Sequence, residues 1–204
     1  MTTNIILVRH GETEWNRVER FRGQIDIPLN TTGIEQAKKT GKKIMKQFKP
    51  SMIYASPLKR ASQTAEKIAV ENDLIIQTID GLTDIDYGDW QGLTPKAVQE
   101  KWPTLAEKWF RRPGTLEIPG GETLHDIQTR ALAALQAIGE WNKDQEIVLV
   151  SHTVVIRAIL LGILRADLDR LWQIGQEPCA INLIEYSPEN TIILSINCVD
   201  HLLG

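Results

Sequence analysis

Asn4-Ile-Ile-Leu-Val-Arg-His-Gly11 is the stretch that decides the fold, and Ile147-Val-Leu-Val-Ser-His-Thr153 repeats its pattern later in the chain. Short apolar runs closed by polar residues are typical of strands that are buried on both faces of a parallel sheet. Ligands of open parallel sheets bind beyond the carboxyl ends of the strands. We therefore expect His10 and His152, which directly follow the two runs, to lie at the functional edge of the sheet.

Around these two stretches, short apolar runs alternate with longer helical periodicities, which is typical of an α/β fold. The sequence predicts strands at 4–8, 52–55, 74–79 and 147–150, helices at 33–48, 57–70, 122–139 and 153–164, and a closing hairpin at 181–186 and 191–199. Ser56 and Pro57 are predicted to be the N-cap and the first residue of the second helix. The expected fold is a three-layer α/β/α sandwich with a mostly parallel central sheet, formed by one domain over 1–204.

The segment 84–121 interrupts this alternation. It is rich in glycine and proline, and it holds Trp90, Trp102 and Trp109 among the six tryptophans of the chain. These residues predict a small, partly helical cap that is inserted over the edge of the sheet.

Composition excludes several classes of function. Acidic residues outnumber basic ones by 26 to 23, so the formal net charge is -3 and no overall basic field attracts nucleic acid or an anionic membrane. No apolar run approaches the ~20 residues that span a bilayer, and the N-terminus has no features of a signal peptide. Cys179 and Cys198 show no framework spacing, so a reducing cytoplasmic location is expected. Metal, P-loop and dinucleotide motifs are absent from the sequence, so neither a metal nor a cofactor is expected.

Arginine accompanies histidine at the predicted functional edge. Arg9 precedes His10, and Arg60 follows the predicted strand 52–55. Guanidinium groups bind phosphate bidentately, and a neutral imidazole attacks phosphorus when its other nitrogen is held by a hydrogen bond. A single histidine at a strand end is more often a structural core residue. Two histidines with two arginines at matching strand ends instead favour an anion pocket.

The sequence resembles the histidine phosphatase superfamily, the phosphoglycerate-mutase-like proteins, over nearly its whole length. The resemblance rests on six motifs in the order of the family: Leu7-Val-Arg-His-Gly-Glu-Thr-Glu-Trp-Asn16, Pro28-Leu-Asn30 with Gly33, Gln36 and Ala37, Ser56-Pro-Leu58 with Arg60, Ala61, Thr64 and Ala65, Tyr87-Gly-Asp-Trp-Gln-Gly92, Gly120-Gly-Glu-Thr123, and Ser151-His152.

The resemblance implies a role for each matching residue. His10 is implied to be the nucleophile that becomes phosphohistidine, while Arg9, Arg60 and His152 hold the phosphoryl oxygens. Asn16 is implied to be a secondary phosphate contact. These implied roles agree with the needs of phosphoryl transfer, which are an in-line nucleophile and positive donors around the equatorial oxygens.

The general acid departs from the family pattern. Asp84 occupies a position where the family usually has glutamate, and its side chain is one methylene shorter. Alignment favours Asp84 as the acid, with Asp86 as the alternative. The predicted activity is metal-independent hydrolysis of a small phosphomonoester through phosphohistidine.

Two other functions stay open at this point. The alternatives are a phosphoglycerate mutase and, on the same scaffold, a non-catalytic phosphate-binding protein. The expected partner is a small phosphorylated substrate. Relatives are often dimers, so a homodimer is one expectation, and the sequence leaves the oligomeric state open.

Overall fold

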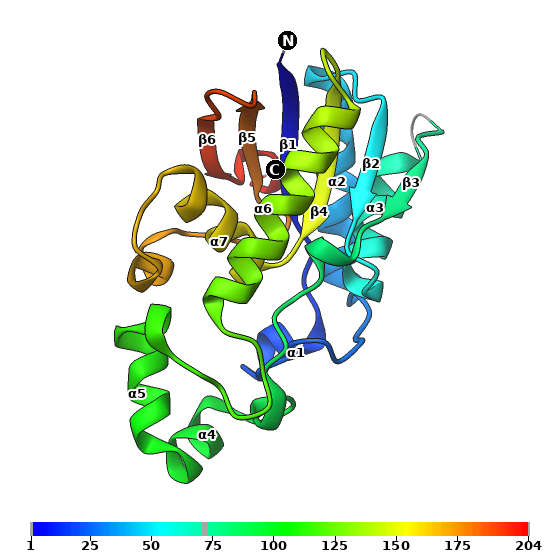
Figure 1. Ribbon diagram of the computed structural model, residues 1–204. Coiled ribbons are helices and arrows are strands. Elements are labelled where there is room, and N and C mark those ends of the chain that lie inside the picture. The colour runs from blue at the N-terminus through cyan, green and yellow to red at the C-terminus, as the bar shows by residue number, and fades with distance from the viewer. Residues whose placement is uncertain (1, 71–72, 204) are drawn as a thin grey trace.

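A single sheet forms the centre of the protein in the computed structural model, which describes residues 2–70 and 73–203 (Figure 1). In these described residues the sheet has six strands in the order β3-β2-β4-β1-β5-β6. Their bounds are β1 Thr3–Arg9, β2 Met52–Ala55, β3 Ile76–Thr78, β4 Glu146–Ser151, β5 Ile181–Tyr186 and β6 Ile192–Cys198. Strands β1 to β4 are parallel, and β5 pairs antiparallel with both β1 and β6. The prediction of a mostly parallel α/β sheet with a closing hairpin is confirmed.

Helices cover both faces of the sheet and make three layers (Figure 1). One face carries α2 (Thr31–Gln47) and α3 (Lys59–Ala69), and the other carries α6 (Leu124–Trp141) and α7 (Thr153–Ile163). Successive residues of a strand point to opposite faces. In β1, Ile6 and Val8 pack on the α2 and α3 side, while Ile5 and Leu7 pack on the α6 and α7 side. This burial on both faces explains the unbroken apolar run that marks the strand.

The second helix begins later than the sequence predicts. Ser56 is not its N-cap, because the buried Ser56 hydroxyl bonds to the ring of His152 at 2.7 Å. Leu58 occupies the N-cap position instead, without a side-chain cap, and α3 starts at Lys59. The Ser56 hydroxyl also accepts the Leu58 N–H at 3.4 Å, so it supports the turn before α3 while it contacts the histidine at the end of β4.

The exit from β1 passes very close to the first turn of α2. A Cβ atom on Gly11 would lie 2.6 Å from the carbonyl oxygen of Gly33, and one on Gly33 would lie 2.1 Å from the carbonyl oxygen of Glu12. Asn30 caps this helix by accepting a hydrogen bond from the Gly33 N–H at 2.8 Å. Only glycine at both positions permits this approach, which holds the residues after β1 against a rigid helix.

The segment 84–121, which we call the cap after the predicted insertion, lies beyond the carboxyl ends of the parallel strands and away from the N-terminus (Figure 1). It contains two short α-helices and two 3-10 turns in its described residues: η2 Gly88–Trp90, α4 Pro95–Lys101, α5 Pro103–Arg111 and η3 Pro113–Thr115. The remaining short elements are α1 Glu14–Arg17, η1 Asp80–Leu82, η4 Leu168–Gln173 and η5 Asp200–Leu202. Across the residues described, no helix is both long and apolar enough to cross a bilayer.

Candidate active site

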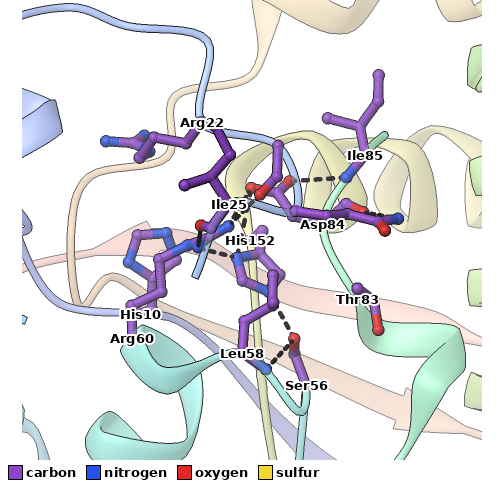
Figure 2. Close-up of polar contacts among 12 residues, drawn as sticks. His10, Arg22, Ile25, Ser56, Leu58, Arg60, Thr83, Asp84, Ile85 and His152 are labelled. Atoms are coloured by element: carbon purple, nitrogen blue, oxygen red, sulfur yellow. Dashed lines mark hydrogen bonds and ion pairs between the residues drawn. The ribbon is translucent and has the colours of Figure 1, made fainter. Parts of the chain in front are cut away.

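The register between β1 and β4 brings the two predicted histidines together. Arg9 lies opposite Ser151, so the next residues, His10 and His152, leave the sheet side by side. The His10 N–H donates to the Ser151 carbonyl at 3.0 Å, and the two imidazole centroids are 5.1 Å apart. Arg60, in the first turn of α3, reaches the same place (Figure 2). We call Arg9, His10, Arg60 and His152 the strand-end cluster.

His10 is held in one tautomer. Its Nδ1 donates to the Gly11 carbonyl at 2.7 Å, so the proton lies on Nδ1 and the lone pair lies on Nε2. In the described part of the chain, Nε2 has no hydrogen-bond partner. Burial, His152 and Arg60 lower the pKa of His10 well below its ordinary value, so the ring is neutral at physiological pH. His10 therefore presents an unprotonated nitrogen beside positive charge.

Arg60 organises the site through four hydrogen bonds (Figure 2). Its Nη groups donate to the Gly23 carbonyl at 2.6 Å, the Ile25 carbonyl at 3.0 Å and the Asp84 carboxylate at 2.8 Å. Its Nε donates to Nδ1 of His152 at 3.2 Å. Since the side chain is fully buried, these contacts fix its orientation.

His152 is neutral in this arrangement. Its Nδ1 accepts from Arg60, so Nε2 carries the proton and donates to the Ser56 hydroxyl at 2.7 Å. Burial and the Arg60 charge lower the pKa of His152 well below its ordinary value. The 3.5 Å approach of Nδ1 to the Asp84 carboxylate is therefore not an ion pair, because both atoms accept from the same guanidinium.

Arg9 adds a second buried guanidinium. Its Nη1 donates to the Gln176 carbonyl, and its Nε, although buried, has no partner among the residues that the structure describes. Burial and the nearby Arg22 lower the pKa of Arg9 to about 10, so it remains charged at neutral pH. An uncompensated donor of this kind suits an anion.

The two candidate acids occupy different surroundings. Asp84 contacts Arg60 and accepts the Ile85 N–H at 3.0 Å (Figure 2). Asp86 instead accepts the Gly88 N–H at 2.8 Å and so closes a turn. The structure brings Asp84, and not Asp86, to the strand-end cluster.

Asn16 shapes the loop after His10. Its side-chain oxygen accepts hydrogen bonds at 2.9 Å from both the N–H and the hydroxyl of Thr13. Within the described residues, the hydrogen bonds of the Asn16 side chain involve its oxygen, so its NH2 group can donate to an anion.

Arg22 is a site residue that the sequence reasoning missed. It borders the same cavity as Asp84, and its Nη1 lies 3.4 Å from the Thr13 hydroxyl. Burial lowers its pKa, with a further lowering by Arg60 that is opposed by Asp84. Arg22 follows the short helix α1 rather than a strand, so an argument from strand ends cannot find it. The available signal was an arginine between an aromatic anchor and a glycine, in Phe21-Arg-Gly23.

A cavity of about 360 Å³ opens beside Asp84 and Arg22. Five of its lining residues are aromatic and come from the cap and its neighbours: Phe21, Tyr87, Trp109, Phe110 and Trp172. The cavity is large enough for a small organic group next to Arg22 and to Asp84, which contacts the buried guanidinium of Arg60.

Fold and site together define an α/β enzyme of phosphoryl transfer. A neutral imidazole with an open Nε2 lies near three guanidinium groups and one carboxyl group, which suit phosphoryl transfer to histidine. In the described residues, no three His, Cys, Asp or Glu side chains gather into a group that could hold a metal ion.

The chain belongs to the histidine phosphatase superfamily (branch 1), whose sequence profile matches residues 5–199. It is 35% identical to phosphoserine phosphatase 1 of Hydrogenobacter thermophilus over 198 residues, which are 97% of this chain and 93% of the relative. The structure of Bacillus stearothermophilus YhfR superposes with a TM-score of 0.93 at 29% identity, covering 98% of this chain and 99% of that one.

A second structural neighbour contains a ligand. A mutant of phosphoserine phosphatase from Entamoeba histolytica in complex with phosphoserine has a TM-score of 0.86 and 29% identity, with coverage of 98% and 99%. The protein is thus a phosphoric monoester hydrolase of the histidine phosphatase type that acts on a small phosphorylated substrate.

Proposed function

We propose that this enzyme hydrolyses a small phosphate ester of an aliphatic alcohol, with phosphoserine as the first candidate, through a phosphohistidine at Nε2 of His10. The observation that carries the proposal is the hydrogen bond from Nδ1 of His10 to the Gly11 carbonyl, which aims the lone pair away from the backbone. The named substrate rests on the phosphoserine phosphatases to which the chain is similar.

In the first step, the Nε2 lone pair of His10 forms a bond to phosphorus, and the bond between phosphorus and the ester oxygen breaks. Once substrate displaces Asp84 from Arg60, the Asp84 carboxylate takes the proton of the phosphate monoanion and donates it to the ester oxygen, so the alcohol leaves neutral. Arg9, Arg22 and Arg60 stabilise the negative charge on the equatorial oxygens, and the Asn16 amide is an outer contact.

His152 is proposed to donate to a phosphoryl oxygen through Nδ1, which faces the site. The Ser56 hydroxyl at Nε2 can both accept and donate a hydrogen bond. A bound phosphoryl group that draws Arg60 away from Nδ1 therefore permits the other tautomer, with the proton on Nδ1.

In the second step, water attacks phosphorus and the P–N bond breaks. The Asp84 carboxylate takes the proton from water, which returns Asp84 to its acid form and His10 to its neutral form. Substrate must also displace the contact between Asp84 and Arg60, because that contact lies beside the nucleophile. The displacement turns the Asp84 carboxyl toward the leaving oxygen.

We also propose a cytoplasmic, homodimeric enzyme with one domain and an inserted cap. Both cysteines are free, which suits a reducing compartment. In the described chain β6 is an edge strand, and it exposes Ile192, Leu194 and Ile196, a row that a second copy would cover. Sedimentation equilibrium tests the dimer by giving twice the chain mass of 23.0 kDa.

The chemical proposal is tested with protein treated with EDTA and given labelled phosphoserine. We expect phosphate release and, after rapid quenching, an acid-labile and alkali-stable phosphoryl label that is absent from His10→Ala. Hydrolysis without such a label, or hydrolysis retained in His10→Ala, would overturn it. Conversion of 3-phosphoglycerate with a bisphosphate primer, faster than any hydrolysis, would identify a mutase instead.

A further inference from the structure

The proposed acid lies on a loop without regular secondary structure. Residues 83–86, here the acid loop, connect the turn η1 to the turn η2. Arg130, which projects from α6, donates to three carbonyls in or next to this loop: Gly81 at 3.1 Å, Thr83 at 2.7 Å and Asp84 at 3.2 Å. One side chain thus fixes the backbone at Gly81, at Thr83 and at Asp84.

Glu122 completes the support from the segment that precedes α6. Its carboxylate pairs with Arg130 through two bonds, at 2.8 Å to Nε and 2.9 Å to Nη2. The same carboxylate accepts the Asp86 N–H at 2.9 Å, and the Glu122 N–H donates to the Asp86 carbonyl at 2.9 Å. The acid loop is therefore held at Asp84 by Arg130 and at Asp86 by Glu122.

This arrangement differs from an ordinary surface ion pair. Both side chains are only 24% exposed, and the two-pronged geometry fixes the guanidinium plane. The other partners of both charged groups are backbone atoms of residues 81–86. The pair therefore connects α6 to the acid loop, whereas an exposed pair such as Lys143 with Glu140 connects neighbouring residues at the end of α6.

We propose that Arg130 and Glu122 are positioning residues that hold the Asp84 carboxyl within reach of the leaving oxygen. The inference rests on the proposed role of Asp84 and extends it to two residues that do not touch substrate. It also gives a function to Glu122 in the motif Gly120-Gly-Glu-Thr123. Because proton transfer requires close contact, a shift of about 1 Å in the loop costs up to about 100-fold in rate.

The test compares two leaving groups. p-Nitrophenolate departs without a proton, whereas the alcohol of phosphoserine requires one. Arg130→Lys keeps the charge but loses the planar fork, so we expect kcat to fall about 10- to 100-fold with phosphoserine and less than about 3-fold with p-nitrophenyl phosphate. Vanadate inhibition should change little, because the strand-end cluster is untouched. Lys143→Met, which removes the exposed pair at the end of α6, is the matched control and should alter neither rate.

A double mutant separates positioning from a general structural effect. With phosphoserine, Asp84→Asn with Arg130→Lys should be no slower than Asp84→Asn alone, because an absent acid cannot be misplaced. Equal losses with both substrates in Arg130→Lys, or additive losses in the double mutant, would overturn the positioning role.

The same measurements separate failure of this inference from failure of the proposed acid. If Asp84→Asn slows both substrates equally, the acid role itself falls, and the positioning role falls with it. If Arg130→Lys does not fold, Glu122→Gln replaces it, since glutamine keeps an oxygen for the Asp86 N–H but loses the ion pair and the hydrogen bond accepted from Arg130 Nε. The ratio of kcat with phosphoserine to kcat with p-nitrophenyl phosphate then decides the outcome.

Discussion

The strand-end cluster and the cap are built differently, and Asp84, which contacts Arg60, lines the cavity beside the cap. In the cluster, Arg60 and His152 are fully buried and are held by directed hydrogen bonds to backbone carbonyls and to other side chains of the site. In the cap, Trp109 packs edge-on against Tyr87 and Trp172, with ring centroids 5.6 Å and 5.2 Å away. Phe110 next to it is 55% exposed.

This difference separates chemistry from recognition. Hydrogen bonds of a buried guanidinium and of buried neutral polar groups require fixed distances, so the cluster accepts few substitutions. Aromatic contacts tolerate changes of shape, so the cap can vary with the substrate's organic part while the phosphate chemistry stays constant. Four predictions test this separation, from the largest expected effect to the smallest.

Arg60→Lys should produce the largest loss. Lysine keeps the charge but cannot reach His152, Asp84 and the Gly23 carbonyl together, so buried acceptors lose their donors. We expect kcat/KM to fall about 10²- to 10³-fold, and the free energy of unfolding to fall by about 3 kcal/mol. Steady-state kinetics and urea unfolding measure both. Arg111→Lys, at an exposed ion pair with Glu107, is the control and should stay within about two-fold of wild type. A loss below ten-fold in Arg60→Lys would contradict a rigid cluster.

Trp109→Ala should mainly cost stability. Its side chain is 2% exposed and contacts four other aromatic rings, from Phe21, Tyr87, Trp90 and Trp172. Removing it should lower the free energy of unfolding by about 3–5 kcal/mol in urea. The remaining folded enzyme should keep its inhibition constant for vanadate, which reports the strand-end cluster. Trp141→Ala, at a tryptophan that is 60% exposed, is the control, with an expected cost below about 1 kcal/mol. Loss of vanadate inhibition would show that the two regions are not separable.

Acid should destabilise the cluster side of the molecule. Burial lowers the pKa of His10 and His152 in the folded state, so below pH 6.5 the unfolded chain binds more protons and stability falls. This contribution is fully present above pH 6.5 and is lost as the pH falls from there toward the folded pKa values. Each histidine adds a slope of about 1.4 kcal/mol per pH unit in that window. Urea unfolding at pH 7.5, 6.0 and 5.5 should show a smaller slope in His10→Gln. The exposed His125→Gln is the control, and equal slopes in wild type and His10→Gln would refute the assignment of a buried neutral ring.

Phe110→Ala should have the smallest effect and the most selective one. Its ring lines the cavity while remaining more than half exposed. The KM for phosphoserine should change by about five-fold or less, with kcat for p-nitrophenyl phosphate unaltered and a shift in thermal midpoint below about 2 °C. Leu164→Ala, at a residue of similar exposure far from the cavity, should change none of these. A large loss of kcat would place this residue in the chemistry rather than in recognition.

The sequence predicted the cluster better than the cap, for a physical reason. Burial on both faces of a parallel sheet leaves an unbroken apolar run, so the ends of β1 and β4, and with them His10 and His152, can be located from the residues alone. No unbroken apolar run of this kind marks the cap or the segment around Arg22. Their places depend on contacts between distant segments, such as the bond from Arg60 to the Gly23 carbonyl. The catalytic roles themselves stay predictions until the variants are measured.

Ser56 shows how tertiary context overrides a local signal. Serine followed by proline predicts a helix N-terminus, yet its hydroxyl bonds to His152 from the end of another strand. Local preferences alone could not reveal this, because the partner lies 96 residues away. Asp84 and Asp86 likewise have different hydrogen-bond partners, which their two-residue spacing in the sequence does not reveal.

The facing pair Gly11 and Gly33 has a consequence for mutational scanning of this enzyme. Any side chain at Gly33 would push against the Glu12 backbone, two residues after His10, and so would move the imidazole. In a mutational scan that measures turnover, substitutions of Gly33 would therefore lower activity as much as substitutions of the reacting groups. Gly33 nevertheless contacts the Glu12 backbone and not the nucleophile. Libraries intended to redirect selectivity should leave both glycines unchanged and place their diversity in the aromatic walls.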